Sequence, residues 1–145
     1  MKSYTDLEQS KKLAEILPLE SADGFWEYHD KGYSIGDEWE WEGYEDYPRA
    51  ESYLEYSRKE NEWKEDKSDV PCWSLSAMLE HLRKHDLFPE IKDADDYILM
   101  DITFYYKDEV VGKVINHVHF IRAQGKNILD ACYEFVLKSH ELNLL

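Results

Sequence analysis

The 145-residue chain is poor in cations: 17 Lys and Arg stand against 32 Asp and Glu, which gives a net charge of −15. Proteins that bind DNA or RNA directly gain most of their affinity from cations that meet phosphates, so we expect no direct nucleic-acid binding. Anionic membrane surfaces are disfavoured for the same reason. The sequence also lacks a run of about 20 apolar residues and the apolar core of a signal peptide. We therefore expect a cytoplasmic protein with no membrane partner.

Cysteine and glycine are scarce as well. Cys72 and Cys132 fit neither a spaced metal motif nor a disulfide framework, and both are predicted to be small buried hydrophobic residues. The 6 glycines form no phosphate-binding loop, and no serine lies in a nucleophile elbow. We therefore expect no cofactor.

What the chain does have is an acidic, aromatic middle. Residues 20–69 hold 17 Asp and Glu against 6 Lys and Arg, together with 11 of the 21 aromatic residues. Disordered segments are poor in aromatic residues and cores are poor in charge, so this region fits neither class. We expect a single domain over residues 1–145 with an acidic aromatic insert at about 36–69.

Three helices are predicted from their caps. Thr5-Asp6-Leu7-Glu8 has the form of a capping box, and Pro18 ends the helix that follows it. Ser74 is expected to cap a second helix, and Asn127 a third with Asp130 at its third position. A further helix is predicted over 50–67.

Strands are predicted at 25–29, at 97–106 and at 113–121, with a turn somewhere in 107–112. Residues 38–42 also alternate as a strand would, and residues 93–96 are expected to form a solvated loop. The elements together predict a two-layer α+β domain, with an antiparallel sheet of about three to five strands and about three helices on one face.

The sequence also resembles a known family. Glu8-Gln9-Ser10-Lys11-Lys12-Leu13, Ser21-Ala22-Asp23 and the run from Pro71 to Leu79 are similar to a pattern found in small uncharacterised proteins of gut anaerobic bacteria and their phages and mobile elements. The final helix, with Asp130-Ala131-Cys132-Tyr133-Glu134, is similar to the way such proteins end. The resemblance implies a cytosolic accessory protein, with no known activity or catalytic residue to transfer.

Asp101, His117 and His119 are the candidate catalytic or metal-binding residues. His117 and His119 alternate along one strand, and Asp101 would face His117 if Tyr106 paired opposite Gly112. A two-residue turn at 108–109 would instead set Met100 against His117, and the site would vanish. In the alternative interpretation the histidines lie on a half-exposed sheet face, and Asp101 pairs with Lys113, Arg122 or a tyrosine hydroxyl.

His81 and His85 stand four residues apart, which is the spacing of zinc ligands on a helix. The glutamate that follows the first histidine in zinc peptidases is replaced by Leu82. Because Leu82 belongs to the apolar side, both histidines are predicted to lie toward the polar, solvated side.

A candidate binding surface lies in the acidic region, where four aromatic residues stand among acids: Trp39, Trp41, Tyr44 and Tyr47. Aromatic anchors are typical of protein interfaces, although these rings could equally cover the sheet as a lid. The leading hypothesis is a non-enzymatic binding protein that meets a basic protein partner, in its sharpest form a mimic of DNA. The alternatives are a small metal-dependent or acid/base enzyme built on Asp101, His117 and His119, and a structural subunit of a larger assembly. The oligomeric state is left open.

Overall fold

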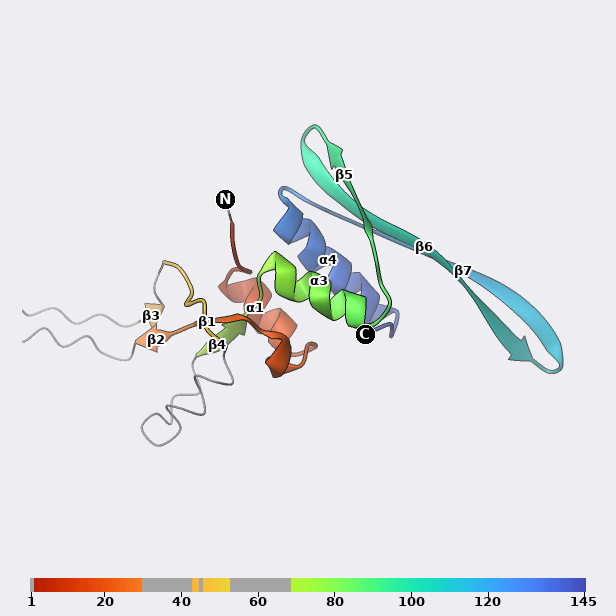
Figure 1. Ribbon diagram of the computed structural model, residues 1–145, viewed down its shortest axis with the longest axis horizontal. Coiled ribbons are helices and arrows are strands. Elements are labelled where there is room, and N and C mark those ends of the chain that lie inside the picture. The colour runs from red at the N-terminus through yellow and green to blue at the C-terminus, as the bar shows by residue number, and fades with distance from the viewer. Residues whose placement is uncertain (1, 30–42, 45, 53–68) are drawn as a thin grey trace, which may run out of the picture. The chain divides into compact units, whose positions relative to one another are not determined.

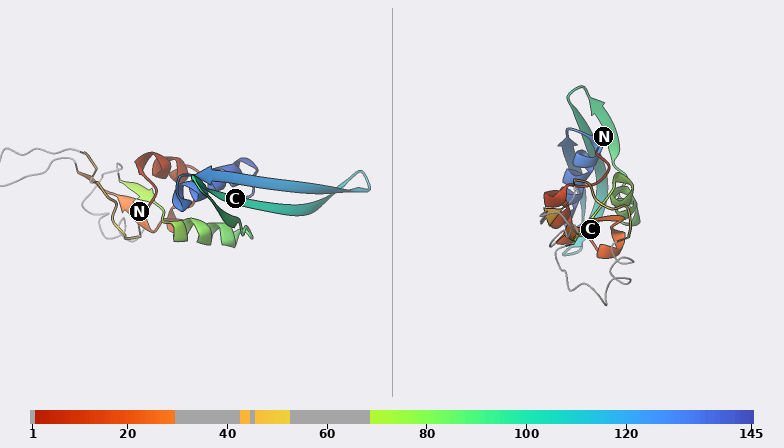
Figure 2. Two further views of the ribbon diagram at one scale, coloured as in Figure 1. Left: turned by 90° about the horizontal axis from the view of Figure 1, so that it is seen from above. Right: turned by 90° about the vertical axis from the view of Figure 1, so that its left-hand side faces the viewer.

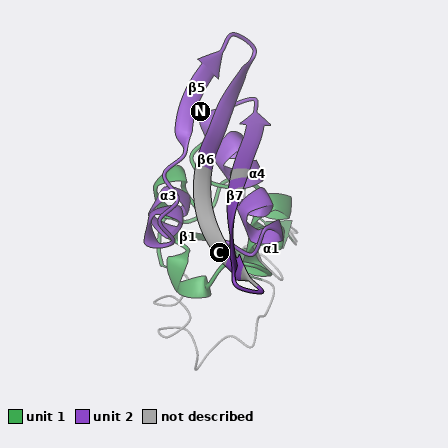
Figure 3. Ribbon diagram, turned by 90° about the vertical axis from the view of Figure 1, so that its right-hand side faces the viewer, with its two compact units in different colours: residues 1–77 green, residues 78–145 purple. Residues whose placement is uncertain are grey.

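The computed structural model describes residues 2–29, 43–44, 46–52 and 69–145 (Figure 1). Helices and antiparallel strands both occur along the chain, which confirms the predicted α+β class. The chain divides into two compact units, residues 1–77 and 78–145 (Figure 3). The single domain remains a prediction. The predicted strand at 38–42 and nearly all of the predicted helix at 50–67 lie outside the described residues.

The described part of unit 1 holds two short antiparallel ladders and the α-helix α1. β1 pairs with β4, β2 pairs with β3, and α1 packs against β4. Its elements are α1 (Leu7–Ala14), the 3-10 helix η1 (Leu19–Ser21), β1 (Gly24–Trp26), β2 (Tyr28–His29), β3 (Gly43–Tyr44) and β4 (Val70–Cys72).

The cap of α1 differs from the prediction by one residue. Asp6, not Thr5, is the N-cap: its carboxylate accepts from the Gln9 amide at 2.8 Å, and the Gln9 side chain accepts from the Asp6 amide at 3.1 Å. The buried Thr5 hydroxyl instead accepts from the Trp73 amide at 3.1 Å. The predicted capping box was wrong because the Thr5 hydroxyl bonds to a backbone amide that is distant in sequence. The residues around Thr5 do not indicate that partner.

The second helix, α3 (Leu75–Lys84), begins where predicted. The Ser74 hydroxyl accepts from the Ala77 amide at 3.2 Å, as an N-cap does. The Asp23 carboxylate accepts from both the amide and the hydroxyl of Ser74, so the cap is itself fixed from another element. The helix is followed by Asp86, whose φ of 58° ends the helical path.

Unit 2 is built on a three-stranded antiparallel sheet in the order β5-β6-β7. Its elements are β5 (Glu90–Ala94), β6 (Tyr97–Val110), β7 (Lys113–Gly125) and α4 (Ile128–Glu141). The predicted loop at 93–96 is corrected, because Asp93 and Ala94 belong to β5. This edge strand is short and largely exposed, and its Glu-Ile-Lys-Asp-Ala sequence has little β-propensity, so only pairing with β6 reveals it.

The β6–β7 hairpin turns at Val111 and Gly112, with Val110 opposite Lys113. Both turn residues have positive φ, 53° and 73°, as a two-residue type I′ turn requires. The turn therefore lies within the predicted range, but neither of the two predicted registers is right. Figures 1 and 2 show the end of this hairpin projecting beyond α4.

α4 covers the other end of the hairpin. Asn127 accepts from the Asp130 amide at 2.9 Å, which confirms the predicted cap. The helix packs on β7 and β6, where Met100, Ile121 and Ala123 are buried. A Cβ on Gly125 would lie 2.3 Å from the Ala131 nitrogen, so only glycine permits the strand to approach the helix this closely. The inner face of the sheet is thus the face that α4 covers.

Candidate functional site

A connected group of charged side chains lies on the outer face of the sheet, the face opposite α4. Glu90, Asp101 and Arg122 are cross-strand neighbours on β5, β6 and β7, so their side chains stand in one row. Lys92 follows two residues after Glu90 and therefore projects from the same face. We call these four residues the charged cluster.

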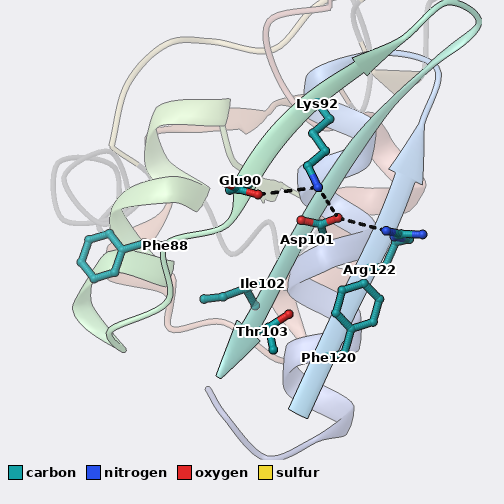
Figure 4. A pocket seen from close by; sticks show the side chains of 8 residues that line it. All are labelled: Phe88, Glu90, Lys92, Asp101, Ile102, Thr103, Phe120 and Arg122. Atoms are coloured by element: carbon teal, nitrogen blue, oxygen red, sulfur yellow. Dashed lines mark hydrogen bonds and ion pairs between the residues drawn. The ribbon is translucent and has the colours of Figure 1, made fainter. Parts of the chain in front are cut away.

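Asp101 is the centre of the charged cluster. Only 5% of it is exposed, and its Oδ2 accepts from Lys92 Nζ and from Arg122 Nη2, both at 3.3 Å (Figure 4). Lys92 Nζ also lies 3.6 Å from Glu90 Oε2. A buried carboxylate requires such partners, because leaving water without them is costly. Pairing of Asp101 with Arg122 was one predicted interpretation and is confirmed; Lys92 was missed because β5 was not predicted.

An open pocket of about 410 Å³ adjoins the charged cluster (Figure 4). Its apolar walls include Phe88 and Phe120, which are both more than half exposed. The Arg122 guanidinium lies 5.0 Å from the centre of the Phe120 ring, within the range of a cation–π contact. The volume falls within the range of small-ligand pockets, about 300–1,000 Å³. Sequence reasoning missed this pocket because its lining comes from three strands and the segment before β5.

Apolar side chains continue along the outer face toward the tip of the hairpin. Val114, Val118 and Phe120 occupy even-numbered positions of β7, with Asn116 between the first two, and Val118 and Phe120 are 60% and 53% exposed. We call these three residues the apolar row. Exposed apolar residues that lie together and are bordered by polar residues are typical of interaction surfaces, whereas singly scattered ones are not.

The candidate catalytic group is not assembled. Asp101 lies opposite Arg122, whereas His117 lies opposite Tyr106 and His119 opposite Phe104. Tyr106 and Phe104 are five and three residues from Asp101 along β6. Positions an odd number of residues apart lie on opposite faces of a strand, so positions 117 and 119 of β7 share the face opposite Asp101. The predicted cluster of Asp101, His117 and His119 is therefore wrong, because the turn lies nearer the Gly112 end of its range than either predicted register assumed.

The second histidine pair also differs from the prediction. His81 is buried and only His85 is exposed, with ring centres 4.8 Å apart. The polar-side prediction therefore holds for His85 and is wrong for His81, because the buried side of α3 is wide enough to take in both Met78 and His81. Within the ranges that the structure describes, no three His, Cys, Asp or Glu side chains are grouped to hold a metal ion.

Both cysteines are buried and free, as predicted. Burial raises the pKa of the Cys132 thiol to about 12. Burial, with a smaller contribution from the Asp23 carboxylate, raises the pKa of Cys72 far above its ordinary value. Since the thiolate is the reactive form, both side chains act as packing residues at neutral pH.

The predicted aromatic surface is only partly described. Trp39 and Trp41 lie outside the described residues. Tyr44 is half-buried and makes an edge-to-face contact with Tyr28, with ring centres 5.2 Å apart. Tyr47 is exposed, so of the two described members it is the one available as an anchor.

Two further findings bear on function. Among the residues whose structure is described, no helix has both the length and the apolar character needed to cross a membrane. Comparisons of the chain with protein-family models, with curated proteins and with solved structures found no match.

Proposed function

We propose that the protein is a non-enzymatic binding protein whose protein partner docks on the outer face of the β5–β6–β7 sheet. The observation that carries this proposal is the apolar row of β7, exposed beside an open pocket. The resemblance to small proteins of gut bacteria and their mobile elements supports an accessory role in the cytosol.

The residues around the pocket suit recognition of a protein. Aromatic residues and Arg are enriched at interface centres, and here Phe88, Phe120 and Arg122 line the same open pocket. The charged cluster contributes two cations and two anions, so it can offer donors and acceptors without a large net charge. Arg122 uses one guanidinium nitrogen toward Asp101 and is about half exposed, which leaves part of its planar fork accessible to a ligand.

The basic partner predicted for the acidic aromatic region remains a separate proposal. The charge of residues 20–69 supports it, and Tyr47 and Asp46 are exposed in the described part of that region. Binding through those acids would weaken steeply with added salt, whereas docking on the apolar row and pocket would change little.

The double variant Phe88→Ser/Phe120→Ser tests the outer face. Both rings are exposed, so we expect the free energy of unfolding to change by only about 0.5 kcal/mol. Proteins retained from the source cell by the immobilised wild type would be purified, and their affinity measured for each variant. We expect the double variant to bind at least about tenfold more weakly.

Val111→Asn is the matched control, because it removes an exposed apolar side chain at the hairpin tip, away from the pocket. It should bind as the wild type does. A purified partner that binds the double variant and the wild type equally well would show that the outer face is not the docking surface.

A further inference from the structure

The second strand of the hairpin differs in charge from the rest of the chain. Residues 110–129 contain no Asp or Glu and form the longest acid-free stretch of a sequence with a net charge of −15. Most surfaces of such a chain repel a second copy of themselves. Along β7, two copies can approach without bringing carboxylates together.

β7 is also the end strand of its sheet. The order β5-β6-β7 leaves one side of β7 without a neighbouring strand in the part of the chain that the structure describes. Natural edge strands are commonly blunted by proline, bulges or charges. From Val114 to Phe120 β7 has no proline, acid, Lys or Arg, and its pairing with β6 is regular throughout.

Two observations show which residues of β7 direct their backbone groups away from β6. In a two-residue hairpin the pair that flanks the turn, here Val110 and Lys113, is hydrogen-bonded, so odd-numbered residues of β7 bond toward β6. Independently, the Arg122 carbonyl accepts from Lys138 Nζ of α4 at 2.6 Å, so this even-numbered residue points outward. The N–H and C=O groups of Val114, Asn116, Val118 and Phe120 therefore point outward as well.

We propose that two copies of the chain pair through this edge, with their β7 strands antiparallel about a twofold axis at His117. This register places Val114 opposite Phe120 of the second copy and Asn116 opposite its Val118, with the same two pairs repeated across the axis. Each such pair exchanges two backbone hydrogen bonds. The two three-stranded sheets become one six-stranded sheet.

The charges and the edge itself favour this register. It sets Lys113 opposite Ile121 and Arg122 opposite Gly112 of the second copy, so the cations do not face each other. A register centred on Val118 would bring the Val114 amide of the second copy to the Arg122 carbonyl, which already accepts from Lys138 Nζ, so two donors would share one oxygen. In this register even-numbered residues of one copy lie opposite even-numbered residues of the other. The apolar rows of both copies therefore lie on the same face of the combined sheet. The pairing uses the strand edge rather than the outer face, so it does not rest on the proposed function.

Charge substitutions at the central pair test the register. We expect the wild type to have twice the monomer mass in light scattering at high micromolar concentration. Asn116→Glu and Val118→Lys each bring like charges together across the axis, and each should weaken dimerisation by about tenfold or more. The double variant Asn116→Glu/Val118→Lys places each Glu opposite a Lys of the other copy, and it should recover most of the lost affinity.

Leu142→Glu is the matched control, because it adds one acid at an exposed position that follows α4 and lies off the edge. It should dimerise as the wild type does. A wild type that stays monomeric at high concentration overturns the proposal, and so does a dimer that Asn116→Glu leaves intact. A double variant as weak as the single variants overturns the register.

Amide hydrogen exchange of the unaltered chain tests the same edge without substitutions. The outward amides of Val114, Asn116, Val118 and Phe120 should exchange more slowly as protein concentration rises. Amides that bond β6, such as Ile115, should show little dependence on concentration. Equal exchange of the outward amides at all concentrations, in a sample that light scattering shows to be dimeric, contradicts pairing through β7.

Discussion

The two faces of the β6–β7 hairpin are made of the same kinds of residue but have different surroundings. On the inner face, where α4 packs on the sheet, Met100, Ile121 and Ala123 are buried almost completely. On the outer face, Val114, Val118 and Phe120 are more than half exposed. The alternation of apolar residues along a strand sets the face on which they lie, but burial needs a second layer. α4 supplies that layer on the inner face.

The comparison also separates the two roles of the hairpin. Its covered inner face contributes to stability. Its outer face offers apolar side chains to another molecule, and the edge of β7 offers backbone groups. Contiguous exposed apolar surfaces of this kind are uncommon on monomeric proteins unless they bind another molecule. Substitutions of matched kind on the two faces should therefore differ in what they change.

Truncation should give the largest difference between the two faces. Met100→Ala removes a completely buried side chain, so we expect a loss of about 2–5 kcal/mol in the free energy of unfolding. Val114→Ala, on the uncovered outer face, should change it by no more than about 0.5 kcal/mol. Urea unfolding at low protein concentration measures both. Equal losses would show that the outer face is as well packed as the inner one.

The charged cluster tests what a buried, ion-paired group contributes on the outer face. Asp101→Asn keeps the size of the side chain but leaves Lys92 and Arg122 without their shared anion, and it should lower stability by roughly 1–2 kcal/mol. The effect is moderate because both cations are half exposed to solvent. Glu80→Gln, which breaks the exposed pair with Arg83, is the control and should have no measurable effect. A stability unchanged in Asp101→Asn would contradict a structural role for the cluster.

The smallest effect is expected at the turn, and it should be stabilising. Val111 adopts a φ of 53°, which is unfavourable for a β-branched residue, whereas Asn tolerates it. Val111→Asn creates the Asn-Gly pair preferred in type I′ turns and should raise the free energy of unfolding by about 1 kcal/mol. Gly112→Ala, at a φ of 73°, should lower it. Destabilisation by Val111→Asn would mean that the turn has another geometry.

Much of the local structure could be predicted from residue patterns. Ser74 and Asn127 cap their helices as expected, since a cap depends on residues within one turn. Both cysteines are buried as expected, and the long strands lie where alternation placed them. The one-residue shift at Thr5 and the missed strand β5 arose because distant partners, the Trp73 amide and β6, decided them.

The candidate site was less predictable, because a site on a sheet depends on register. Moving the turn by a few residues replaced His117 with Arg122 as the neighbour of Asp101, and a site with possible chemistry became an ion-paired cluster. Residue types near a turn permit several positions, and local energies differ little among them. Burial of the correct face over many residues selects one.

The sequence alone determined the charge, the α+β class, most helix starts and the acid-free character of β7, because these depend on composition or on neighbours along the chain. Tertiary structure decided the register, the pairing of Lys92 with Asp101, the pocket and the extent of α4's cover. Each of these depends on which distant residues meet. The outward backbone groups of β7 follow from both, since the residues form the strand and the turn sets its phase.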